Sequence, residues 1–278
     1  MNYIGIRGHR GAGKSSIAWL LANTIDFIKQ GNEGLLNKEI FDNLYKRWCN
    51  QIMLDPNIFN EEGLQYVYLD SFSDSIKTFI QLLLGCPEEY LKEDSYKDTI
   101  VINLRDFSCT PIEQLNDIEL VTSNELYDSI DKDMDPQPLM KNTYITLREF
   151  ILYFGLDVMQ RFFGRNVWVK SLRANTEMLD KFYDGKGMYK VYMDLKTPPE
   201  ATYIKQQNGL IVNVVRPGHK KGQSGLERLG RDDRIDYTIE VNGELYNTKN
   251  DVINIANDII NKFEKDGRKE GDSQKENN

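Results

Sequence analysis

The sequence predicts an α/β fold in which helices cover both faces of a parallel sheet, giving three layers. Short apolar segments typical of buried strands alternate along the chain with longer segments of helical periodicity. A glycine-rich turn separates the first strand from the first helix, and 278 residues are enough for one large core. Strands that are joined through helices run in the same direction with right-handed crossovers, so the sheet is expected to be parallel.

Each expected element has a signal of its own. Apolar runs between polar turns predict strands at residues 3–6, 65–69, 189–193, 210–215 and 237–241. Apolar residues that recur every three or four positions predict helices at residues 16–22, 75–84, 146–162, 167–183, 199–207 and 249–263. A capping box, Thr146 to Glu149, opens the helix that carries Phe150, Phe154, Val158 and Phe162.

This alternation assigns residues 1–263 to one domain with two insertions. In residues 31–63, apolar side chains at four-residue spacing indicate an amphipathic helix; a packed surface helix is favoured, and a lid or a homodimer face stays open. Residues 87–142 are polar and acidic, and a structureless loop of that length is unusual, so we expect local helices or a small subdomain. Residues 264–278 are charged and are expected to form a disordered tail.

Composition limits the kinds of partner. The net charge of −8 argues against binding to polynucleotides or anionic membranes by general attraction, while a local basic pocket for a small anion stays possible. Three widely spaced cysteines, Cys49, Cys86 and Cys109, indicate a reducing compartment. No leader sequence and no apolar stretch near the roughly 20 residues of a membrane span is present, so a cytoplasmic location is expected.

The strongest local signal is Gly8-His9-Arg10-Gly11-Ala12-Gly13-Lys14-Ser15, which matches the phosphate-binding pattern GxxxxGK[ST] between a strand and a helix. Glycines let the backbone approach phosphate oxygens closely, and the helix N-terminus attracts negative charge. Lys14 is expected to reach the β- and γ-phosphates, and the Ser15 hydroxyl to ligate Mg²⁺. The pattern therefore predicts a P-loop NTPase fold that binds ATP with Mg²⁺ through Gly8, Arg10, Gly11, Ala12, Gly13, Lys14, Ser15 and Ser16.

Six further segments follow the loop in a fixed order: Phe72 to Lys77, Leu147-Arg148 with Phe154 to Asp157, Val167 to Val169, Asp194 to Glu200, Val214 to Gly218, and Asp236 to Gly243. Together they resemble the motifs of the deoxynucleoside monophosphate kinases of bacteriophages. Each motif is short and weak alone, but their shared order behind a complete phosphate loop is specific. The resemblance extends at intervals over the predicted domain and skips both insertions.

The resemblance implies transfer of the γ-phosphoryl group of Mg-ATP to a deoxynucleoside monophosphate. It implies catalytic roles for Lys14, Lys196 and Arg148, and a contact of Arg216 with ATP. Asp194 ends an apolar strand, where a carboxylate can hold Mg²⁺ beside Ser15; a turn cap is the alternative. Contacts with the acceptor are implied for Asp74, Lys77, Arg148, Asp157, Trp168, Lys196 and Glu200.

Two departures from the family pattern bear on specificity. Lys196 stands where the family usually has arginine, and a lysine offers a point charge in place of a planar fork. Leu156 replaces the usual threonine and removes one hydroxyl. An ATP-binding switch protein, a catalytically degenerate member of the family and a kinase for another small molecule therefore stay as alternatives.

For several of these side chains an ordinary structural role is the alternative to a role in binding. Asp74 and Lys77 lie one helical turn apart and would also fit an exposed ion pair. Arg148 stands in the first turn of its helix, an unfavourable place for a cation, which favours a nearby phosphate or simple solvent exposure. The loop that carries Arg216, Arg228, Arg231 and Arg234 fits a lid over ATP or a solvated loop. Core packing competes with base stacking for Phe107, Tyr153 and Trp168.

Overall fold

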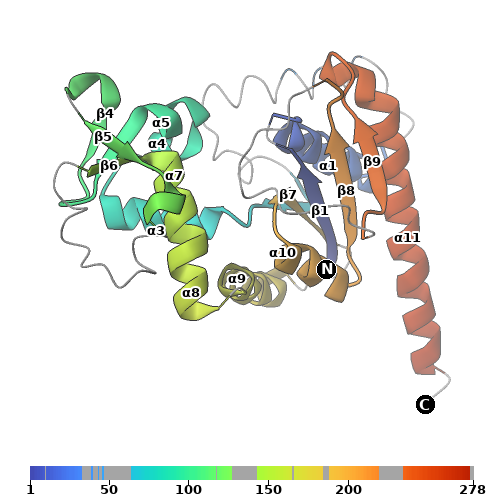
Figure 1. Ribbon diagram of the computed structural model, residues 1–278. Helices are drawn as coiled ribbons and strands as arrows, with labels where there is room; N and C mark the ends of the chain where they lie inside the picture. Colours follow the sequence, from blue (N-terminus) through green and yellow to red (C-terminus); the bar gives the residue numbers. More distant parts are fainter. Residues whose placement is uncertain are drawn as a thin grey trace. The chain divides into compact units, whose positions relative to one another are not determined.

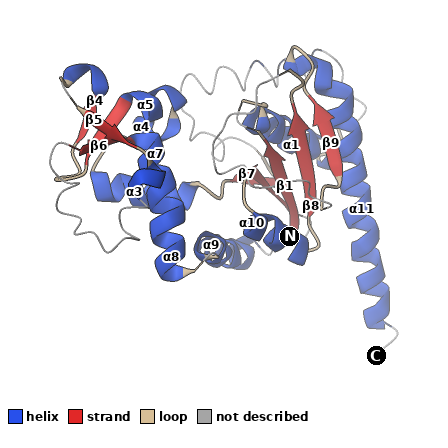
Figure 2. Cartoon of the chain, in the orientation of Figure 1, coloured by secondary structure: helices blue, strands red, loops and turns tan. Residues whose placement is uncertain are grey.

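The computed structural model describes residues 1–9, 11–32, 64–116, 118–126, 143–164, 166–183, 188–218 and 234–275, together with the single residues 39, 43 and 46. The chain divides into two compact units (Figures 1 and 2). The first unit comprises residues 1–72 and 175–278, and the second comprises residues 73–174. The insertion predicted at residues 31–63 lies almost wholly outside the described residues.

The described part of the first unit contains a five-stranded sheet in the order β2-β7-β1-β8-β9, and all four strand pairs are parallel. This confirms the predicted parallel sheet, with β1 at its centre (Figure 2). The strands lie close to the predicted positions: β1 Asn2–Gly8, β2 Val67–Asp70, β7 Tyr189–Leu195, β8 Leu210–Val215 and β9 Tyr237–Glu240.

Helices cover both faces of this sheet, as predicted. On one face, α1 (Lys14–Lys29) and α11 (Lys249–Lys275) share a core with Ile4 and Ile6 of β1, which are both fully buried. On the other face lies α10 (Pro198–Gln206), where the rings of Tyr3, Phe72, Tyr192 and Tyr203 form a buried aromatic cluster. Figure 1 shows α1 and α10 on opposite sides of β1.

Asp26, a buried acid of α1, holds the chain where it enters β2. Its Oδ1 accepts hydrogen bonds from the backbone N–H groups of Gln65 (2.8 Å) and Tyr66 (2.6 Å). Its Oδ2 accepts one from Nε2 of Gln30 at 2.5 Å. Burial raises the pKa of Asp26, and these hydrogen bonds oppose that rise. One side chain thereby joins α1 to the residues that lead into β2.

The described part of the second unit contains a four-stranded sheet in the order β4-β3-β6-β5. Its strands are β3 Ile100–Asn103, β4 Cys109–Pro111, β5 Glu119–Val121 and β6 Thr143–Thr146. Its helices are α3 Asp74–Leu84, α4 Glu88–Lys92, α5 Asp94–Thr99, the 3₁₀ turn Ile112–Gln114, α7 Leu147–Leu152, α8 Met159–Phe163 and the first part of α9 Val167–Tyr183. The described part of the predicted 87–142 insertion forms α4, α5, the 3₁₀ turn and β3 to β5, and it belongs to a larger unit that also contains residues 73–86 and 143–174.

The helix predicted at residues 146–162 contains a π-helical turn, Tyr153–Val158, between α7 and α8. The extra residue of a π turn rotates every later side chain about the helix axis. Phe150 and Phe154 still stack, with centroids 6.1 Å apart, but Phe162 is 76% exposed. Phe162, the last member of the apolar series in this predicted helix, therefore faces solvent in the structure.

Of the two hydrogen bonds that define a capping box at Thr146, the one accepted by the threonine hydroxyl is confirmed. The Thr146 hydroxyl accepts the N–H of Glu149 at 3.2 Å, as predicted. The Glu149 carboxylate instead accepts from the backbone N–H and the hydroxyl of Ser123, at 3.0 and 2.7 Å. Glu149 thus links α7 to the segment after β5, a contact between residues distant in sequence.

α11 continues to Lys275, so the expected disordered tail after residue 263 is helical in the structure through that residue. Lys, Glu, Gln and Arg are good helix formers, and no proline interrupts them, although two glycines weaken the segment. A 3₁₀ turn, Leu245–Thr248, leads into this helix. No helix in the described part of the chain is long and apolar enough to cross a membrane.

Replacing Asp26 by alanine is expected to lower the free energy of unfolding by about 2–4 kcal/mol, because two backbone N–H groups lose the buried carboxylate that accepts them. Chemical denaturation followed by circular dichroism measures the change. Asp258→Ala, an exposed acid of α11, is the control and should stay within about 0.5 kcal/mol of the parent. A variant of Asp26 as stable as this control would show that the carboxylate does not hold the β2 entry.

Candidate functional site

The predicted phosphate loop lies between the central strand β1 and α1. Gly11 and Gly13 have φ values of 75° and 91°, backbone conformations that glycine adopts most readily. Gly13 precedes α1 and no side chain caps the helix there, nor does an acidic residue stand in its first turn. The N–H groups at this helix start are thus arranged as anion-binding helix termini are.

The backbone of β8 requires a glycine at residue 8. It pairs with Val214 of β8 and has a φ of 153°. A Cβ atom added at Gly8 would lie 2.4 Å from the carbonyl oxygen of Val214, a distance that no side chain can relieve because the clash is with backbone. The first glycine of the pattern therefore lets the loop begin directly beside β8.

Lys14 folds back over the loop. Its Nζ donates to the carbonyl oxygens of Gly8 (2.7 Å) and His9 (2.8 Å). Ala12 is buried, and its N–H donates to the His9 carbonyl at 3.1 Å, which closes the turn. Ser15 and Ser16 lie in the first turn of α1, and Arg10 lies outside the described residues.

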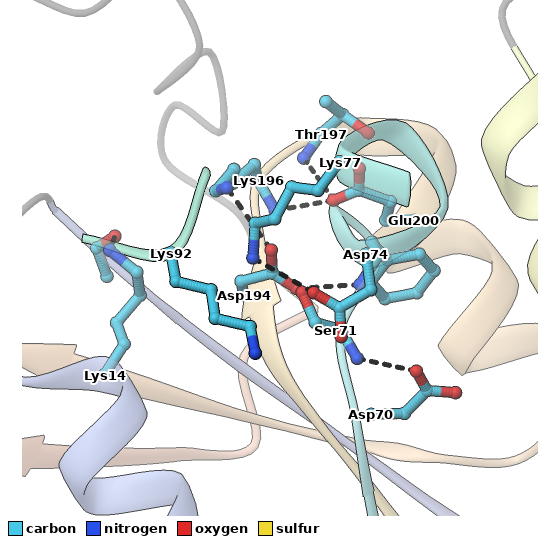
Figure 3. Close-up of polar contacts among 12 residues, drawn as sticks. Lys14, Asp70, Ser71, Asp74, Lys77, Lys92, Asp194, Lys196, Thr197 and Glu200 are labelled. Atoms are coloured by element: carbon cyan, nitrogen blue, oxygen red, sulfur yellow. Dashed lines mark hydrogen bonds and ion pairs between the residues drawn. The ribbon is translucent and has the colours of Figure 1, made fainter. Parts of the chain in front are cut away.

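Asp194 stands near the end of β7, the strand beside β1. Its Oδ1 accepts the backbone N–H of Phe72 at 2.8 Å, and its Oδ2 lies 3.3 Å from Nζ of Lys196. The Asp194 side chain is only 13% exposed, whereas that of Lys196 is 37% exposed. Figure 3 shows the two charged groups facing each other. The predicted metal ligand and the predicted catalytic lysine are therefore neighbours.

Glu200 supports the segment that carries Lys196. Its Oε2 accepts the backbone N–H groups of Lys196 (2.6 Å) and Thr197 (2.9 Å) at the start of α10 (Figure 3). Burial raises the pKa of Glu200 to about 7; the charge of Asp194 adds to the rise, and both N–H groups and the Lys196 ammonium oppose it. The Glu200 carboxylate thus accepts backbone N–H groups at the start of α10. Its contact with the acceptor nucleotide stays a prediction.

The loop after β8 carries the remaining predicted ATP contact. Arg216 is exposed and follows β8 directly, beside the strand that leads into the phosphate loop. The strand that follows β1, β2, lies at one edge of the sheet, and the strand that follows β8, β9, lies at the other edge. α/β proteins bind ligands at such a switch point. Arg234, a candidate lid residue, instead donates to the Pro198 carbonyl (3.2 Å) and the Thr202 hydroxyl (2.8 Å) of α10. Arg228 and Arg231 lie outside the described residues.

The second unit brings together three of the family-like segments. Trp168 of α9 donates its Nε1–H to the Gly155 carbonyl in the π turn at 2.6 Å. Gly155 packs against Ile76 of α3, where an added Cβ would lie 3.2 Å from the Ile76 side chain. Segments 74–77, 154–157 and 167–169 are thus neighbours, although they are far apart in sequence.

These contacts favour packing over base stacking for Trp168, which is 7% exposed. Asp74 and Lys77 form the ion pair that their spacing allows, with Oδ1 and Nζ 3.0 Å apart (Figure 3). Phe107 is 41% exposed and has a φ of 58°, a strained backbone for an aromatic residue. The side chain of Asp157 is not among the described ones.

Sequence reasoning missed two acids and a lysine. Asp98 of α5 forms a two-point pair with Arg148: Nε donates to Oδ1, and Nη2 donates to Oδ2 at 3.1 Å. In the first unit, the fully buried Lys190 pairs with Asp70 at 2.8 Å and lies 5.2 Å from the rings of Tyr68 and Tyr192. The register of β2 against β7 creates this second cluster, and a register is not visible in one strand alone.

Comparison of the chain with models of known protein families gives no match. A search of curated proteins gives none either. The chemistry of the site therefore has to be inferred from the residues themselves and from their arrangement.

Gly8→Ala is expected to destabilise the protein more than Gly13→Ala. Gly13 has a left-handed φ but nothing within 4 Å of an added Cβ, so its replacement costs only backbone strain of about 1–2 kcal/mol. At Gly8 the backbone clash with β8 adds to the strain. Urea denaturation of the two variants measures both costs, and equal stabilities would show that the β1–β8 contact does not require glycine.

Proposed function

We propose that this chain is a deoxynucleoside monophosphate kinase, which transfers the γ-phosphoryl group of Mg-ATP to the acceptor to give a deoxynucleoside diphosphate and ADP. The observation that carries the proposal is a complete GxxxxGKS loop between the central parallel strand and α1, with Asp194 on the adjacent strand. We infer that the three-layer fold is of the P-loop NTPase type, which places these groups in this way.

The loop supplies the groups that hold the donor. The uncapped start of α1 presents N–H groups and a positive dipole end to the triphosphate. The Lys14 ammonium lies against the loop carbonyls of Gly8 and His9. A local movement of this side chain would exchange those two carbonyls for the β- and γ-phosphates of ATP. Arg216, after β8, adds a second cation for ATP.

The oxygen groups of Ser15 and Asp194 fit Mg²⁺, a hard ion that prefers oxygen ligands. In the described residues no group of three or more His, Cys, Asp or Glu side chains is arranged to hold a metal. Mg²⁺ in phosphoryl-transfer enzymes takes one or two protein ligands and completes its shell with phosphate and water, so it needs no such cluster. Held by Ser15 and Asp194, such an ion would neutralise part of the phosphate charge.

The acceptor requires little chemical activation. Its phosphate has a second pKa near 6 and is largely ionised at neutral pH, so no general base is needed. What the chain must supply is alignment of two anions and compensation of their repulsion. Lys196 in the first unit is the candidate cation that contacts the transferred phosphoryl group. In the second unit, Arg148 and the assembled segments 74–77, 154–157 and 167–169 support an acceptor-binding role.

Lys14→Ala is expected to lower acceptor-dependent turnover by at least about 10³-fold, because it removes a preorganised charge from the transferred phosphoryl group. A coupled ADP-release assay with Mg-ATP and a panel of deoxynucleoside and ribonucleoside monophosphates measures the rate. Circular dichroism checks that the variant is folded.

The same assay separates the alternatives. Turnover with particular deoxynucleotides that is lost in Lys14→Ala supports the kinase and identifies its bases. ADP release that needs no acceptor, or ATP binding without release, favours a switch protein or a degenerate enzyme. A fully active Lys14→Ala variant would contradict the catalytic assignment.

Lys196→Arg is expected to preserve or raise turnover, since it restores the planar fork of the family pattern, while Lys196→Glu should nearly abolish it. Steady-state kcat for the best acceptor measures both variants. Lys196→Glu also places a like charge beside Asp194, so Lys196→Ala, which removes the charge without adding another, is measured with it. Equal activity of Lys196→Glu and the parent would show that residue 196 does not contact phosphate.

A further inference from the structure

We propose that Asp98 is a positioning residue for Arg148, and that it holds the guanidinium ready for the phosphate of the acceptor nucleotide. The inference rests on the proposed function, which gives Arg148 that phosphate as its ligand. Both residues belong to the second unit: Asp98 is in α5, and Arg148 is in the first turn of α7.

The two side chains meet as a fork. Nε of Arg148 donates to Oδ1 of Asp98, and Nη2 donates to Oδ2 over 3.1 Å. Two parallel hydrogen bonds fix the plane of a guanidinium as well as its position. The Arg148 side chain is 21% exposed, so most of it is enclosed while part of it stays accessible to a ligand from solvent.

The second sheet determines this pairing. β3 and β6 are antiparallel, with Val101 opposite Thr146. Asp98 comes just before β3 and Arg148 just after β6, so the antiparallel register brings both residues to the same end of the paired strands. Ile100 and Leu147, the residues at the two junctions, are buried in the core of the second unit and keep the backbone there in place.

Arg148 benefits from such a partner for two reasons. The first turn of a helix carries partial positive charge, which disfavours a cation unless an anion is near. A free arginine side chain also has many rotamers, and a fork that orders it beforehand reduces the entropy lost on ligand binding. A guanidinium has five N–H donors, and a carboxylate fork occupies two of them, so one guanidinium can bind a carboxylate and a phosphate together.

Two other accounts predict different results. If the pair is only an exposed ion pair, it contributes little, and removing the acid would leave acceptor binding unchanged. If Asp98 instead withholds Arg148 from the ligand, removing the acid would tighten acceptor binding. A positioning role predicts weaker binding, so the sign of the change separates the three accounts.

The test compares Asp98→Asn and Asp98→Glu with the parent in the full-length chain. With Asp98→Asn, the KM and the calorimetric Kd for the best deoxynucleoside monophosphate should rise about tenfold, while the KM for ATP stays within about twofold. With Asp98→Glu, which keeps the charge but lengthens the side chain, the rise should be smaller, about threefold. Glu119→Gln, an exposed acid in β5 of the same unit, is the matched control and should change neither constant.

Unchanged or tighter acceptor binding by a folded Asp98→Asn variant, in the presence of normal parent activity, overturns this inference and leaves the proposed function intact. Absence of acceptor-dependent turnover in the parent overturns both. If Asp98→Asn does not fold, Asp98→Glu decides the question, because an acceptor KM equal to that of the parent overturns the positioning role.

Discussion

The close approach of β1 and β8 at Gly8 is the constraint on which the proposed donor site depends. Gly8 lies against the Val214 carbonyl so closely that a single methyl group would force the strands apart. Because the strands stay paired up to this point, the loop turns at the carboxyl edge of the sheet and α1 begins at Lys14. The start of α1, Lys14 and the loop carbonyls then occupy fixed positions at the centre of the parallel sheet.

Carboxylates hold the chain next to several strands of the first unit by accepting backbone N–H groups. Asp194 accepts from Phe72, Glu200 from Lys196 and Thr197, and Asp26 from Gln65 and Tyr66. Buried carboxylates are costly unless they are hydrogen-bonded, and each of these satisfies backbone donors that would otherwise lack partners. Asp26 holds the chain where it enters β2, while Asp194 and Glu200 hold it after β2 and after β7. Asp194 keeps a second oxygen facing Lys196.

In the second unit, too, hydrogen bonds between residues distant in sequence hold the elements together. Its sheet register brings Asp98 beside Arg148, and its π turn offers the Gly155 carbonyl to Trp168. π turns often occur at functional sites because they displace one residue from the regular helix. The segment predicted as a polar insertion thus supplies β3, α5 and Asp98, the acid that pairs with Arg148.

The sequence by itself determined the five strands of the parallel sheet, most of the helices around it and the glycine-rich turn between β1 and α1, because periodicity and glycine placement act over a few neighbouring residues. Only the tertiary structure decided that Glu149 bonds Ser123, that Phe162 turns outward, that α11 extends to Lys275, and that Lys190 and Asp70 pair inside the sheet. The two side-chain contacts, Glu149 with Ser123 and Lys190 with Asp70, depend on strand register and on residues distant in the chain. Neither composition nor spacing contains that information, since one residue of slip or one extra residue in a turn redirects every later side chain.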